Sequence, residues 1–523
     1  MSSSASLDDS KNMHKKRRRK KRLRLEDITV IDSPTLKRAV AAAALGNAME
    51  WYDFGVYAYL AVVIGDVFFT GADPTIRQLA TFGAFTVAFL IRPIGGMVFG
   101  PLGDKVGRKK ILALTMIMMS ASTFCIGLIP SYDSIGVWAP ILLLLARLVQ
   151  GFSTGGEYGG AATFIAEYSP DRKRGLMGSW LEFGTTSGYF LGAAIVSILT
   201  TLLPTGDLHS WGWRIPFFVA GPLGIIGLYM RSRLEETPAF QDQSEQAASE
   251  PTQKNEFVNM VTGHWKPLLV CIGLVLVFNV TDYMLLSYMP TYLSANLNYS
   301  QSHGTYLVLV VMLVMLVMQP IVGALSDKIG RKPIILFGSM AALLLSVPEL
   351  WLIQSGNEAF ILIGLIMMGL TLNCFTGTMP STLPALFPTA IRYGALAIAF
   401  NVSVSLFGGT TPLVTSWLIS ASGNLYMPAF YLMLAGVIGA ITILCTRETA
   451  GKRLIGSKPA AADKAEAKEL LAEHHETIEE QVEDISSEIE RLEVRRDNLI
   501  YEHPELYKQQ QAEEQQQAEK GKE

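Results

Sequence analysis

Two carboxylates, Glu50 and Asp53, lie three residues apart in the first long apolar stretch of the chain. On an α-helix this spacing places both side chains on one face, which Tyr57 extends by another turn. Carboxylates away from bulk water raise each other's proton affinity, because burial and like-charge repulsion both disfavour the ionised forms. The pair is therefore a candidate for binding and releasing a proton. Glu50 is the first choice, since Asp53 could lie closer to a helix end.

Arg92, in the second apolar stretch, is the cation that could meet this pair. A charge inside an apolar span costs about 2.5 to 3.5 kcal/mol even on the lenient insertion scale, so each charge needs a partner or a purpose. A permanent ion pair between Arg92 and one carboxylate would serve structure alone. The structural and the proton-coupling interpretations are compatible if Arg92 changes partner during a functional cycle.

Four more charged residues lie inside apolar stretches. Arg147 could bind a substrate carboxylate through its planar guanidinium, or lock its helix to a carboxylate of the first stretch. Glu157 follows two glycines, in a segment whose small residues favour close helix packing. Glu182 and Asp282 either line a cavity or bond to a neighbouring helix. All four are candidates for a substrate cavity.

Aromatic residues accompany these charges. A quaternary ammonium group is held well by aromatic faces, because cation–π attraction needs no short hydrogen bond. Aromatics at helical spacing also serve as packing or interface residues, so their abundance allows such a ligand without identifying it. The candidates are Trp51, Tyr57, Trp180, Tyr283 and Tyr288, and we expect Tyr57 and Tyr283 to line the cavity.

Membrane spans are the elements that must position these residues. Half of the 523 residues are hydrophobic, only 17% are charged, and the mean hydropathy is +0.31, which is too apolar for a series of soluble domains. Between residues 39 and 446 lie twelve apolar stretches of roughly 20 residues, the length that crosses a membrane as a helix. No signal peptide is evident, because a long charged segment precedes the first stretch. The stretches centre near Tyr52, Val87, Met118, Gly151, Gly188, Ile225, Val280, Leu313, Leu343, Met368, Val404 and Val437.

Lys and Arg collect in alternate loops. Fifteen lie in the loops after the second, fourth, sixth, eighth and tenth stretches, whereas the opposite loops hold only Arg77 and the span-edge Arg214. Basic residues favour the cytoplasmic side of a membrane. The bias therefore predicts that these loops and both termini are cytoplasmic.

A ten-residue phrase occurs twice, 223 residues apart. The first copy is Gly100-Pro-Leu-Gly-Asp-Lys-Val-Gly-Arg-Lys109 and the second is Gly323-Ala-Leu-Ser-Asp-Lys-Ile-Gly-Arg-Lys332. The duplication predicts two six-helix halves, whose parallel arrangement places a substrate near the midplane between them. The predicted divisions are a basic tail at 1–38, halves at 39–230 and 265–446, a linker at 231–264 and an acidic tail at 447–523.

The repeated phrase resembles the signature of the major facilitator superfamily. Segments 46–54, 92–96, 151–158 and 211–217 resemble its metabolite–proton symporters of bacterial inner membranes. Segments 282–290 and 372–379, with the long acidic C-terminus, resemble the osmoregulatory proline/betaine transporters of that branch. The resemblance implies an all-α membrane fold of twelve transmembrane helices and proton-coupled uptake of zwitterionic osmolytes, activated by osmotic stress.

The resemblance also implies a role for the repeated loops, which hold and release one conformation in the superfamily. An aspartate at a helix end can accept hydrogen bonds from the N-terminus of a helix in the other half. A topology anchor alone is the plainer interpretation. The residues matched to the role are Asp104, Gly107, Arg108, Asp327, Gly330 and Arg331.

Other functions stay open. Arg147 within Ala146-Arg-Leu-Val-Gln-Gly151 resembles organic-acid carriers, so proton-coupled uptake of a 2-oxoacid or dicarboxylate is the alternative. A membrane sensor that does not transport is a further class. An enzyme is not expected, because no nucleophile cluster, phosphate-binding loop or metal-ligand spacing stands out and the four cysteines are isolated. We expect no cofactor, no metal and no nucleic acid.

The termini carry a separate signal. Residues 1–38 have a net charge of +7 and residues 447–523 one of −8, which predicts contact of the basic tail with anionic lipid headgroups and a response to ionic strength. Apolar residues alternate at spacings of four and three over about 471–499, which predicts a coiled coil. His475 and Arg496 in the seam favour an antiparallel homodimer. The seam is Leu471, His475, Ile478, Val482, Ile485, Ile489, Leu492, Arg496 and Leu499.

Overall fold

The computed structural model describes residues 24–25, 28–31, 33–106, 108–155, 157–232, 263–389 and 391–474, with single positions between 489 and 505. At some helical positions, among them Asp104, Arg108 and Glu157, only the backbone is described. The chain divides into two compact units. One is Ile31–Pro459, and the other combines Met1–Val30 with Ala460–Glu523.

The first half of the unit Ile31–Pro459 is helical throughout its described residues, with short turns between helices. Its elements are α2 (Ser33–Tyr59), α3 (Ala61–Phe68), α4 (Pro74–Leu90), α5 (Arg92–Val106), α6 (Arg108–Leu128), α7 (Tyr132–Ile135), α8 (Trp138–Ser153), α9 (Glu157–Tyr168), η2 (Asp171–Lys173), α10 (Arg174–Leu202), α11 (Thr205–Ser210), η3 (Gly212–Arg214) and α12 (Ile215–Ser232).

The second half repeats this pattern and adds three π-helical segments, η4, η5 and η7. Its elements are α15 (Trp265–Asp282), η4 (Tyr283–Tyr288), α16 (Met289–Thr291), η5 (Tyr292–Asn296), α17 (Gln301–Ile329), α18 (Arg331–Ile353), α19 (Glu358–Thr376), α20 (Met379–Thr382), η6 (Pro384–Leu386), α21 (Arg392–Ser403), η7 (Val404–Gly408), α22 (Thr411–Ser422) and α23 (Met427–Leu444). Because π-helix is rare and concentrates at functional sites, these segments mark places to inspect.

The described helices account for all the predicted spans. Nine of them are long and apolar enough to cross a membrane, and the pair Leu36–Tyr59 and Ala61–Phe68, bent by 62°, passes together as a tenth. Two shorter apolar helices, Ala113–Leu128 and Gly212–Ile226, contain the predicted centres near Met118 and Ile225. All twelve centres therefore fall in helices.

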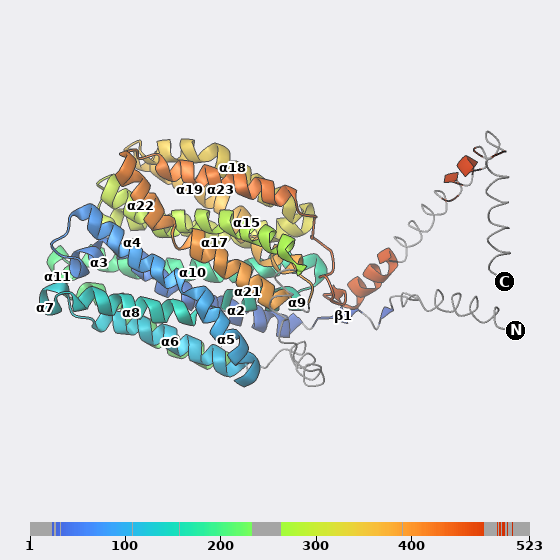
Figure 1. Cartoon of the computed structure of the whole chain (residues 1–523), viewed down its shortest axis with the longest axis horizontal. Helices are drawn as coiled ribbons and strands as arrows, with labels where there is room; N and C mark the ends of the chain where they lie inside the picture. The colour runs from blue at the N-terminus through green and yellow to red at the C-terminus, as the bar shows by residue number, and fades with distance from the viewer. Residues whose placement is uncertain are drawn as a thin grey trace. The chain divides into compact units, whose positions relative to one another are not determined.

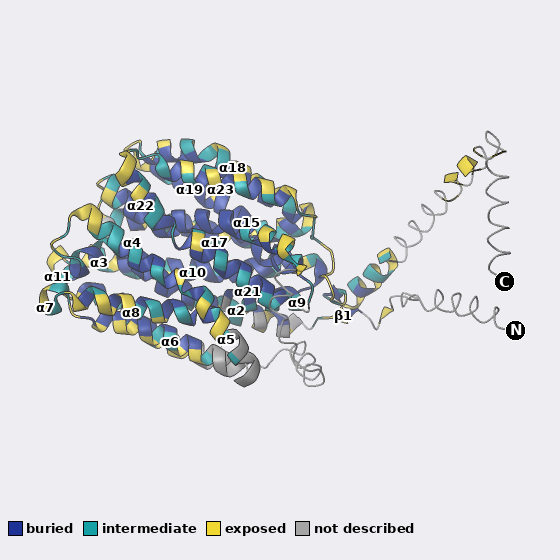
Figure 2. Ribbon diagram, viewed as in Figure 1, coloured by how far each residue is buried: buried dark blue, intermediate teal, exposed yellow. Residues whose placement is uncertain are grey.

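The two halves pack against each other along their length (Figure 1). In that view the first half, blue to teal, lies below the second half, green to orange. Helix α10 of the first half packs along α17 of the second, α21 packs against α9, and α22 against α4. Buried residues concentrate in α2, α10 and α15, whereas peripheral helices such as α6 and α18 expose large apolar side chains (Figure 2), as expected of faces that meet lipid.

Close helix packing depends on the glycines that the sequence singled out near Glu157. A Cβ atom on Gly155 would lie 2.3 Å from the backbone oxygen of Arg92 and 2.3 Å from the backbone nitrogen of Gly96. No side chain fits there without moving the backbone, so glycine is what lets the α8–α9 turn contact α5. The prediction of close packing is confirmed at this position.

The predicted divisions differ from the structure at two places. Helix α2 begins at Ser33, inside the segment predicted as a basic tail. Residues 446–457, predicted as part of the acidic tail, belong instead to the unit Ile31–Pro459 and bond its helical part. We call this segment the strap. The sequence did not reveal this because the strap is polar and continues directly into the acidic segment. The predicted linker lies outside the described residues from 233 to 262.

The second unit pairs two segments from opposite ends of the chain. Strand β1 (Thr29–Val30) runs parallel to β2 (Ala460–Ala461), with Thr29 opposite Ala460. Ile28, Ala461 and Ala467 form a small apolar cluster, against which Leu470 and Leu471 pack. Leu471 of the predicted seam therefore has an intramolecular contact.

Candidate functional site

Glu50 and Arg92 form an ion pair inside the first half. Arg92 Nη2 lies 2.9 Å from Glu50 Oε1, and the two side chains are 1% and 2% exposed. Arg92 is the first residue of α5, and its guanidinium carbon lies 4.6 Å from the ring centres of both Phe54 and Phe89. The rings offset part of the desolvation of the cation. The expected meeting of Arg92 with the acidic pair is thus present, with Glu50 as its partner.

Asp53 has a different partner from Glu50. Its Oδ2 accepts a hydrogen bond of 2.9 Å from Thr123 Oγ1 on α6, and the aspartate is only 4% exposed. Thr123 in turn accepts a hydrogen bond of 2.8 Å from Gln150 Nε2 on α8. Gln150 Oε1 accepts from Arg147 Nη1, three residues earlier on the same helix. On the predicted proton-binding face of α2, Glu50 therefore forms an ion pair, whereas Asp53 is connected to the cation Arg147 through two uncharged side chains.

Arg147 is a fully buried cation with donors to spare. Its guanidinium carbon lies 4.1 Å from the ring centre of Tyr57 and 5.3 Å from that of Phe85. Atoms Nε and Nη2 have no hydrogen-bond partner among the described residues. The sequence left open whether Arg147 locks to a carboxylate on α2. In the structure Arg147 bonds Gln150, so rings and a neutral amide surround its charge, and two of its nitrogen atoms, Nε and Nη2, stay available as donors.

Glu182 and Asp282 lie on α10 and α15, on either side of the contact between the halves. Glu182 Oε1 accepts a hydrogen bond from the hydroxyl of Tyr158 on α9, and Tyr158 stacks on Phe400 of α21 with ring centres 3.9 Å apart. Asp282 is 2% exposed, and its Oδ1 has no hydrogen-bond partner among the described residues. Asp282 is the last residue of α15 and directly precedes the π-helical segment η4.

Aromatic rings fill the space between these charges. The ring centre of Trp51 lies 5.8 Å from that of Tyr283 and 5.5 Å from that of Tyr189. Tyr283 also meets Phe89 edge-on at 5.2 Å. Trp180 is instead 36% exposed, so it is not a member of this cluster. Which side of α10 faces the other helices decides the exposure of Trp180, and the sequence alone did not predict that side.

A small cavity reaches both predicted proton-binding residues. Its volume is about 10 Å³, room for about one water molecule. It lies between α2, α6 and α12, and its lining includes Glu50, Asp53, Ser120 and Gly224. Water there could contact either carboxylate.

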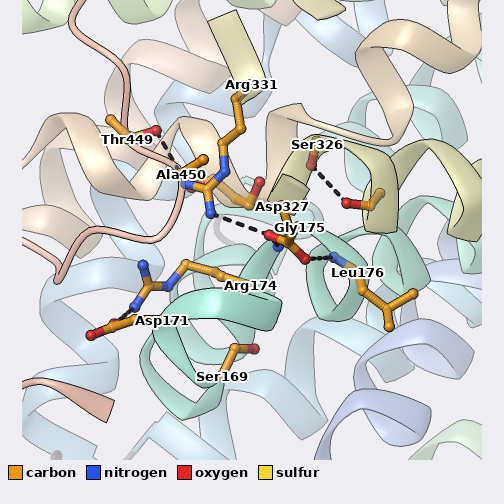
Figure 3. Close-up of polar contacts among 12 residues, drawn as sticks. Ser169, Asp171, Arg174, Gly175, Leu176, Ser326, Asp327, Arg331, Thr449 and Ala450 are labelled. Atoms are coloured by element: carbon orange, nitrogen blue, oxygen red, sulfur yellow. Dashed lines mark hydrogen bonds and ion pairs between the residues drawn. The ribbon is translucent and has the colours of Figure 1, made fainter. Parts of the chain in front are cut away.

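The second copy of the repeated phrase forms a polar cluster at one end of the helices (Figure 3). Asp327 accepts hydrogen bonds of 2.7 and 2.9 Å from the backbone N–H groups of Gly175 and Leu176, in the first turn of α10. Arg331 Nη2 lies 3.9 Å from Asp327 Oδ1. An aspartate of one half therefore contacts the N-terminus of a helix in the other half, as the sequence allowed for these loops.

The strap holds the same end together. Glu448 accepts hydrogen bonds from the backbone N–H groups of Arg331 and Lys332 at 3.1 and 2.9 Å, and so caps α18. Gly330, just before that helix, has φ of 101° and would bring a Cβ within 2.6 Å of Glu448 Oε2. Burial raises the pKa of Glu448, but four backbone N–H donors outweigh it, so the pKa lies below its ordinary value of 4.5.

Further contacts join the strap to both halves. Arg174 of the first half donates to Lys452 O, and Arg392 of the second donates to Ile455 O, each at 2.9 Å. Leu454 is buried against Ala166 and Ala385. The strap therefore bridges the halves at the end where Asp327 lies.

Several functional candidates were missed from the sequence. Thr123 and Gln150 carry no charge, and such residues are common in membrane helices, so they gave no signal by themselves. Tyr158 was passed over beside Glu157. Glu448 contacts residues more than 100 positions earlier in the chain. Glu349, 1% exposed in α18, is a buried acid that a search for charges within apolar stretches could have found.

Some predicted residues lie outside what the structure describes. Gly107 is not described, and Asp104, Arg108 and Glu157 are described by backbone alone. Of the seam, His475, Ile478, Val482 and Ile485 are outside the described residues, whereas Ile489, Leu492, Arg496 and Leu499 are exposed. Among the described residues no group of three or more His, Cys, Asp or Glu could hold a metal ion.

Two family models match the chain. The model described as Major Facilitator Superfamily matches residues 42–408 and 272–477. The model described as Osmosensory transporter coiled coil matches residues 462–507, which include the predicted seam.

Curated relatives match nearly the whole chain. The glycine betaine/proline/ectoine/pipecolic acid transporter OusA of Dickeya dadantii is 56% identical over 94% of this chain and 100% of its own length. The proline/betaine transporter of Escherichia coli K12 is 54% identical over 94% of this chain and 99% of its own. A putative proline/betaine transporter of Staphylococcus aureus strain COL is 46% identical over 86% and 96%.

Solved structures share the fold at low identity. The proton:xylose symporter XylE bound to 6-bromo-6-deoxy-D-glucose aligns with a TM-score of 0.66 at 18% identity, over 84% of this chain and 99% of its own. The partially occluded inward-open form of the xylose transporter XylE from Escherichia coli gives 0.63 at 18% identity, over 81% and 100%.

Proposed function

The chain belongs to the major facilitator superfamily, and from this premise we propose that it carries zwitterionic osmolytes of the proline and glycine betaine type into the cell together with protons. The observation that carries the proposal is the buried Arg147, whose Nε and Nη2 have no hydrogen-bond partner among the described residues, together with Asp282, whose Oδ1 has none there either. A zwitterion supplies the complement of both charges. Relatives that match over almost their full length are named for these substrates.

The substrate carboxylate binds Arg147, whose Nε and Nη2 are adjacent on one edge of the guanidinium and suit a bidentate contact. The cationic end of the substrate binds among the rings of Trp51 and Tyr283, close to Asp282. A quaternary ammonium has no N–H donor, so rings hold it better than a single carboxylate does. Glu182 and Tyr57 complete the candidate lining, and Glu157 stays a prediction from the sequence because the structure describes only its backbone.

Proton coupling uses Glu50, Asp53 and Arg92. In the structure Arg92 is paired with Glu50, and Asp53 has no such cation bonded to it. Protonation of Glu50 releases Arg92, which lies among rings and is free to turn toward another acceptor. Substrate and proton then stabilise one another's bound states, which is the thermodynamic requirement for symport.

The repeated loops control access. Asp327 and its partners on α10 hold the two halves together at one end, and the halves separate there when these bonds break. We assign Gly330 and Arg331 to the same device, and Asp104, Gly107 and Arg108 to its counterpart in the first copy. The end that carries Asp327 faces the cytoplasm, as do both termini, according to the distribution of basic residues in the loops.

The termini provide regulation. The segment that matches the osmosensory coiled coil associates as an antiparallel homodimer through its seam, and the basic N-terminal run contacts anionic lipid headgroups. The orientation is tested by disulfide crosslinking of cysteines introduced by Arg496→Cys alone, and by His475→Cys with Arg496→Cys. The antiparallel arrangement predicts efficient 475-to-496 crosslinks; 496-to-496 crosslinks alone would contradict it.

Transport is tested with the full chain in proteoliposomes that have an alkaline interior. Labelled glycine betaine and proline are expected to accumulate, and a protonophore is expected to abolish the accumulation. Uptake that ignores the proton gradient would contradict symport. The free cation Arg147 also favours the organic-anion alternative, so strong competition by 2-oxoglutarate against betaine uptake would favour that class instead.

A further inference from the structure

We propose that Thr123 and Gln150 are positioning residues that link the protonation of Asp53 to the occupancy of Arg147. The inference rests on the proposed function and adds to it the route by which substrate and proton influence each other. It is carried by one chain of hydrogen bonds that connects three helices, and of its four members Asp53 alone lines the small cavity.

The chain runs from α2 through α6 to α8. Asp53 Oδ2 accepts from Thr123 Oγ1 at 2.9 Å, Thr123 Oγ1 accepts from Gln150 Nε2 at 2.8 Å, and Gln150 Oε1 accepts from Arg147 Nη1. Thr123, Gln150 and Arg147 are each 0% exposed. Water in the cavity therefore reaches Asp53 but not the bonds that Thr123, Gln150 and Arg147 make with one another.

The direction of each bond follows from the chemistry of the ends. A guanidinium can only donate, so the oxygen of the Gln150 amide faces Arg147 and its nitrogen faces Thr123. The hydroxyl oxygen of Thr123 accepts from that nitrogen. Its single hydrogen then has two acceptors within reach, Asp53 Oδ2 at 2.9 Å and the backbone oxygen of Met119 at 3.1 Å.

This arrangement accommodates both protonation states of Asp53. When Asp53 is ionised, the Thr123 hydroxyl donates to it. When Asp53 binds a proton from solvent, its own O–H donates to Thr123, and the Thr123 hydrogen turns to Met119 O. The proton stays on Asp53 until it returns to solvent, and no buried donor or acceptor loses its partner in either state.

The other end of the chain responds to substrate. A carboxylate bound to Nε and Nη2 of Arg147 draws the guanidinium away from Gln150, which bonds Nη1, because a bond between two ionised groups is stronger than one from the guanidinium to a neutral amide. Gln150 is then held less firmly, and so is the donor that orients Thr123 toward Asp53. Occupancy of Arg147 thereby changes the stability of ionised Asp53 through one amide and one hydroxyl.

Other charged groups near Asp53 have their own partners. On α2 these are Glu50, which bonds Arg92 of α5, and Tyr52, whose hydroxyl donates to the backbone oxygen of Pro216. Arg147 of α8 is the remaining cation. The α6 and α12 residues that line the cavity beside Asp53, among them Ser120 and Gly224, are uncharged. The Thr123 hydroxyl is therefore the group on α6 that distinguishes the two states of Asp53.

The test compares Thr123→Val with Thr123→Ser in proteoliposomes and in detergent. Thr123→Val keeps the shape and removes the hydroxyl. We expect the pH midpoint of betaine uptake to move about one unit upward, since a bond to the ionised carboxylate is stronger than one to the neutral acid. Thr123→Ser is expected to restore the wild-type profile. Ser122→Ala is the matched control, because Ser122 is next to Thr123 in α6 and its hydroxyl donates to Met118 O of the same helix.

A second measurement reads the coupling directly. Betaine added to the purified protein in weakly buffered solution is expected to cause proton binding in the wild type, followed with a pH indicator. Gln150→Leu is expected to retain betaine binding within about fivefold while proton binding per substrate falls by at least half, because the link between the two sites is cut. It also provides the test if Thr123→Val does not reach the membrane.

The outcomes separate this inference from the function on which it rests. Wild-type protein that takes up no osmolyte with protons would overturn the proposed function. Wild-type symport together with unchanged pH profile and unchanged proton binding in Thr123→Val or Gln150→Leu would overturn the link alone. A shift equally large in Ser122→Ala would show a general effect of α6 packing and would also overturn it.

Discussion

Asp327 and Glu448 at one end of the molecule accept hydrogen bonds from backbone N–H groups in the first turns of helices, whereas Glu50 and Asp53 in the interior are bonded by side chains. A backbone donor moves only when its helix moves. A side-chain donor can rotate and exchange partners while the helices stay in place. The first kind of contact suits a device that holds a conformation, and the second suits a site that binds protons and ligands.

The acidic groups differ in the same way, whereas the buried arginines Arg147 in the interior and Arg331 at the end both have nitrogen atoms without a hydrogen-bond partner among the described residues. In the interior, Asp282 has a carboxylate oxygen without a partner among the described residues. At the end, both carboxylate oxygens of Asp327 and of Glu448 accept hydrogen bonds. Buried polar groups left unpaired cost about 1 to 3 kcal/mol each, so their persistence in the interior is understandable if a ligand completes them.

Glu50→Gln should give the largest effect. The substitution keeps the shape but removes the titrating carboxyl and leaves Arg92 without its anion, so we expect proton-driven uptake to fall at least 100-fold. Initial rates of betaine uptake with and without a pH gradient measure this. The amount of folded protein in the membrane is the control, and normal pH-dependent uptake in the variant would remove Glu50 from the mechanism.

Arg147→Lys tests whether the free N–H groups bind substrate. Lysine keeps the charge but offers no bidentate fork, so the Kd for betaine should rise about 10- to 100-fold, equivalent to about 1.4 to 2.7 kcal/mol. Binding to purified protein, followed by tryptophan fluorescence, measures it. Unchanged affinity would place the substrate carboxylate elsewhere. Arg214→Lys is a matched arginine control, because Arg214 donates to the backbone oxygens of Gly127 and Ile129 at the end of α6.

Asp327→Asn tests the holding device. The amide oxygen can accept one of the two backbone bonds but carries no charge toward the α10 N-terminus, which should cost about 1 to 2 kcal/mol. Separation of the halves at this end should therefore become about 5- to 30-fold more favourable. Labelling of a cysteine introduced by Ser179→Cys, next to Gly323 across the contact, would report it. Labelling equal to that of the parent cysteine variant would argue against a holding role.

Glu448→Gln should have the smallest effect. The pKa of Glu448 in the folded state is below its ordinary value of 4.5, so its stabilising contribution is complete above about pH 4.5 and is lost as pH falls through the lower folded value. Because the residue is partly exposed, we expect a loss of less than about 1 kcal/mol at pH 7. Thermal unfolding in detergent at pH 7 and pH 4 measures it. A difference between variant and wild type that grows at pH 4 would contradict this sign.

Much of the fold could be predicted because a membrane imposes strong local rules. Spans must be apolar and about 20 residues long, so the twelve centres could be located, including those of the two shorter helices. Charges within spans are costly, so Glu50, Arg92 and Arg147 could be recognised as functional candidates because they are charged residues in apolar stretches. The exposure of Trp180 and the contacts of the strap were not predicted. Both depend on how helices and loops pack, which local sequence does not specify.

The sequence by itself determined the duplicated helical architecture, the family and the short set of buried charges. The architecture and the buried charges depend on composition and on local spacing, and the family follows from the resemblance of the repeated phrase and the other motifs to a known signature. Only the tertiary structure decided which charge meets which partner: Glu50 with Arg92, Asp53 with Thr123, Arg147 with Gln150, and Asp327 with the start of α10. Hydrogen bonds act over about 3 Å, and residues far apart in the chain come within that distance only when helices pack.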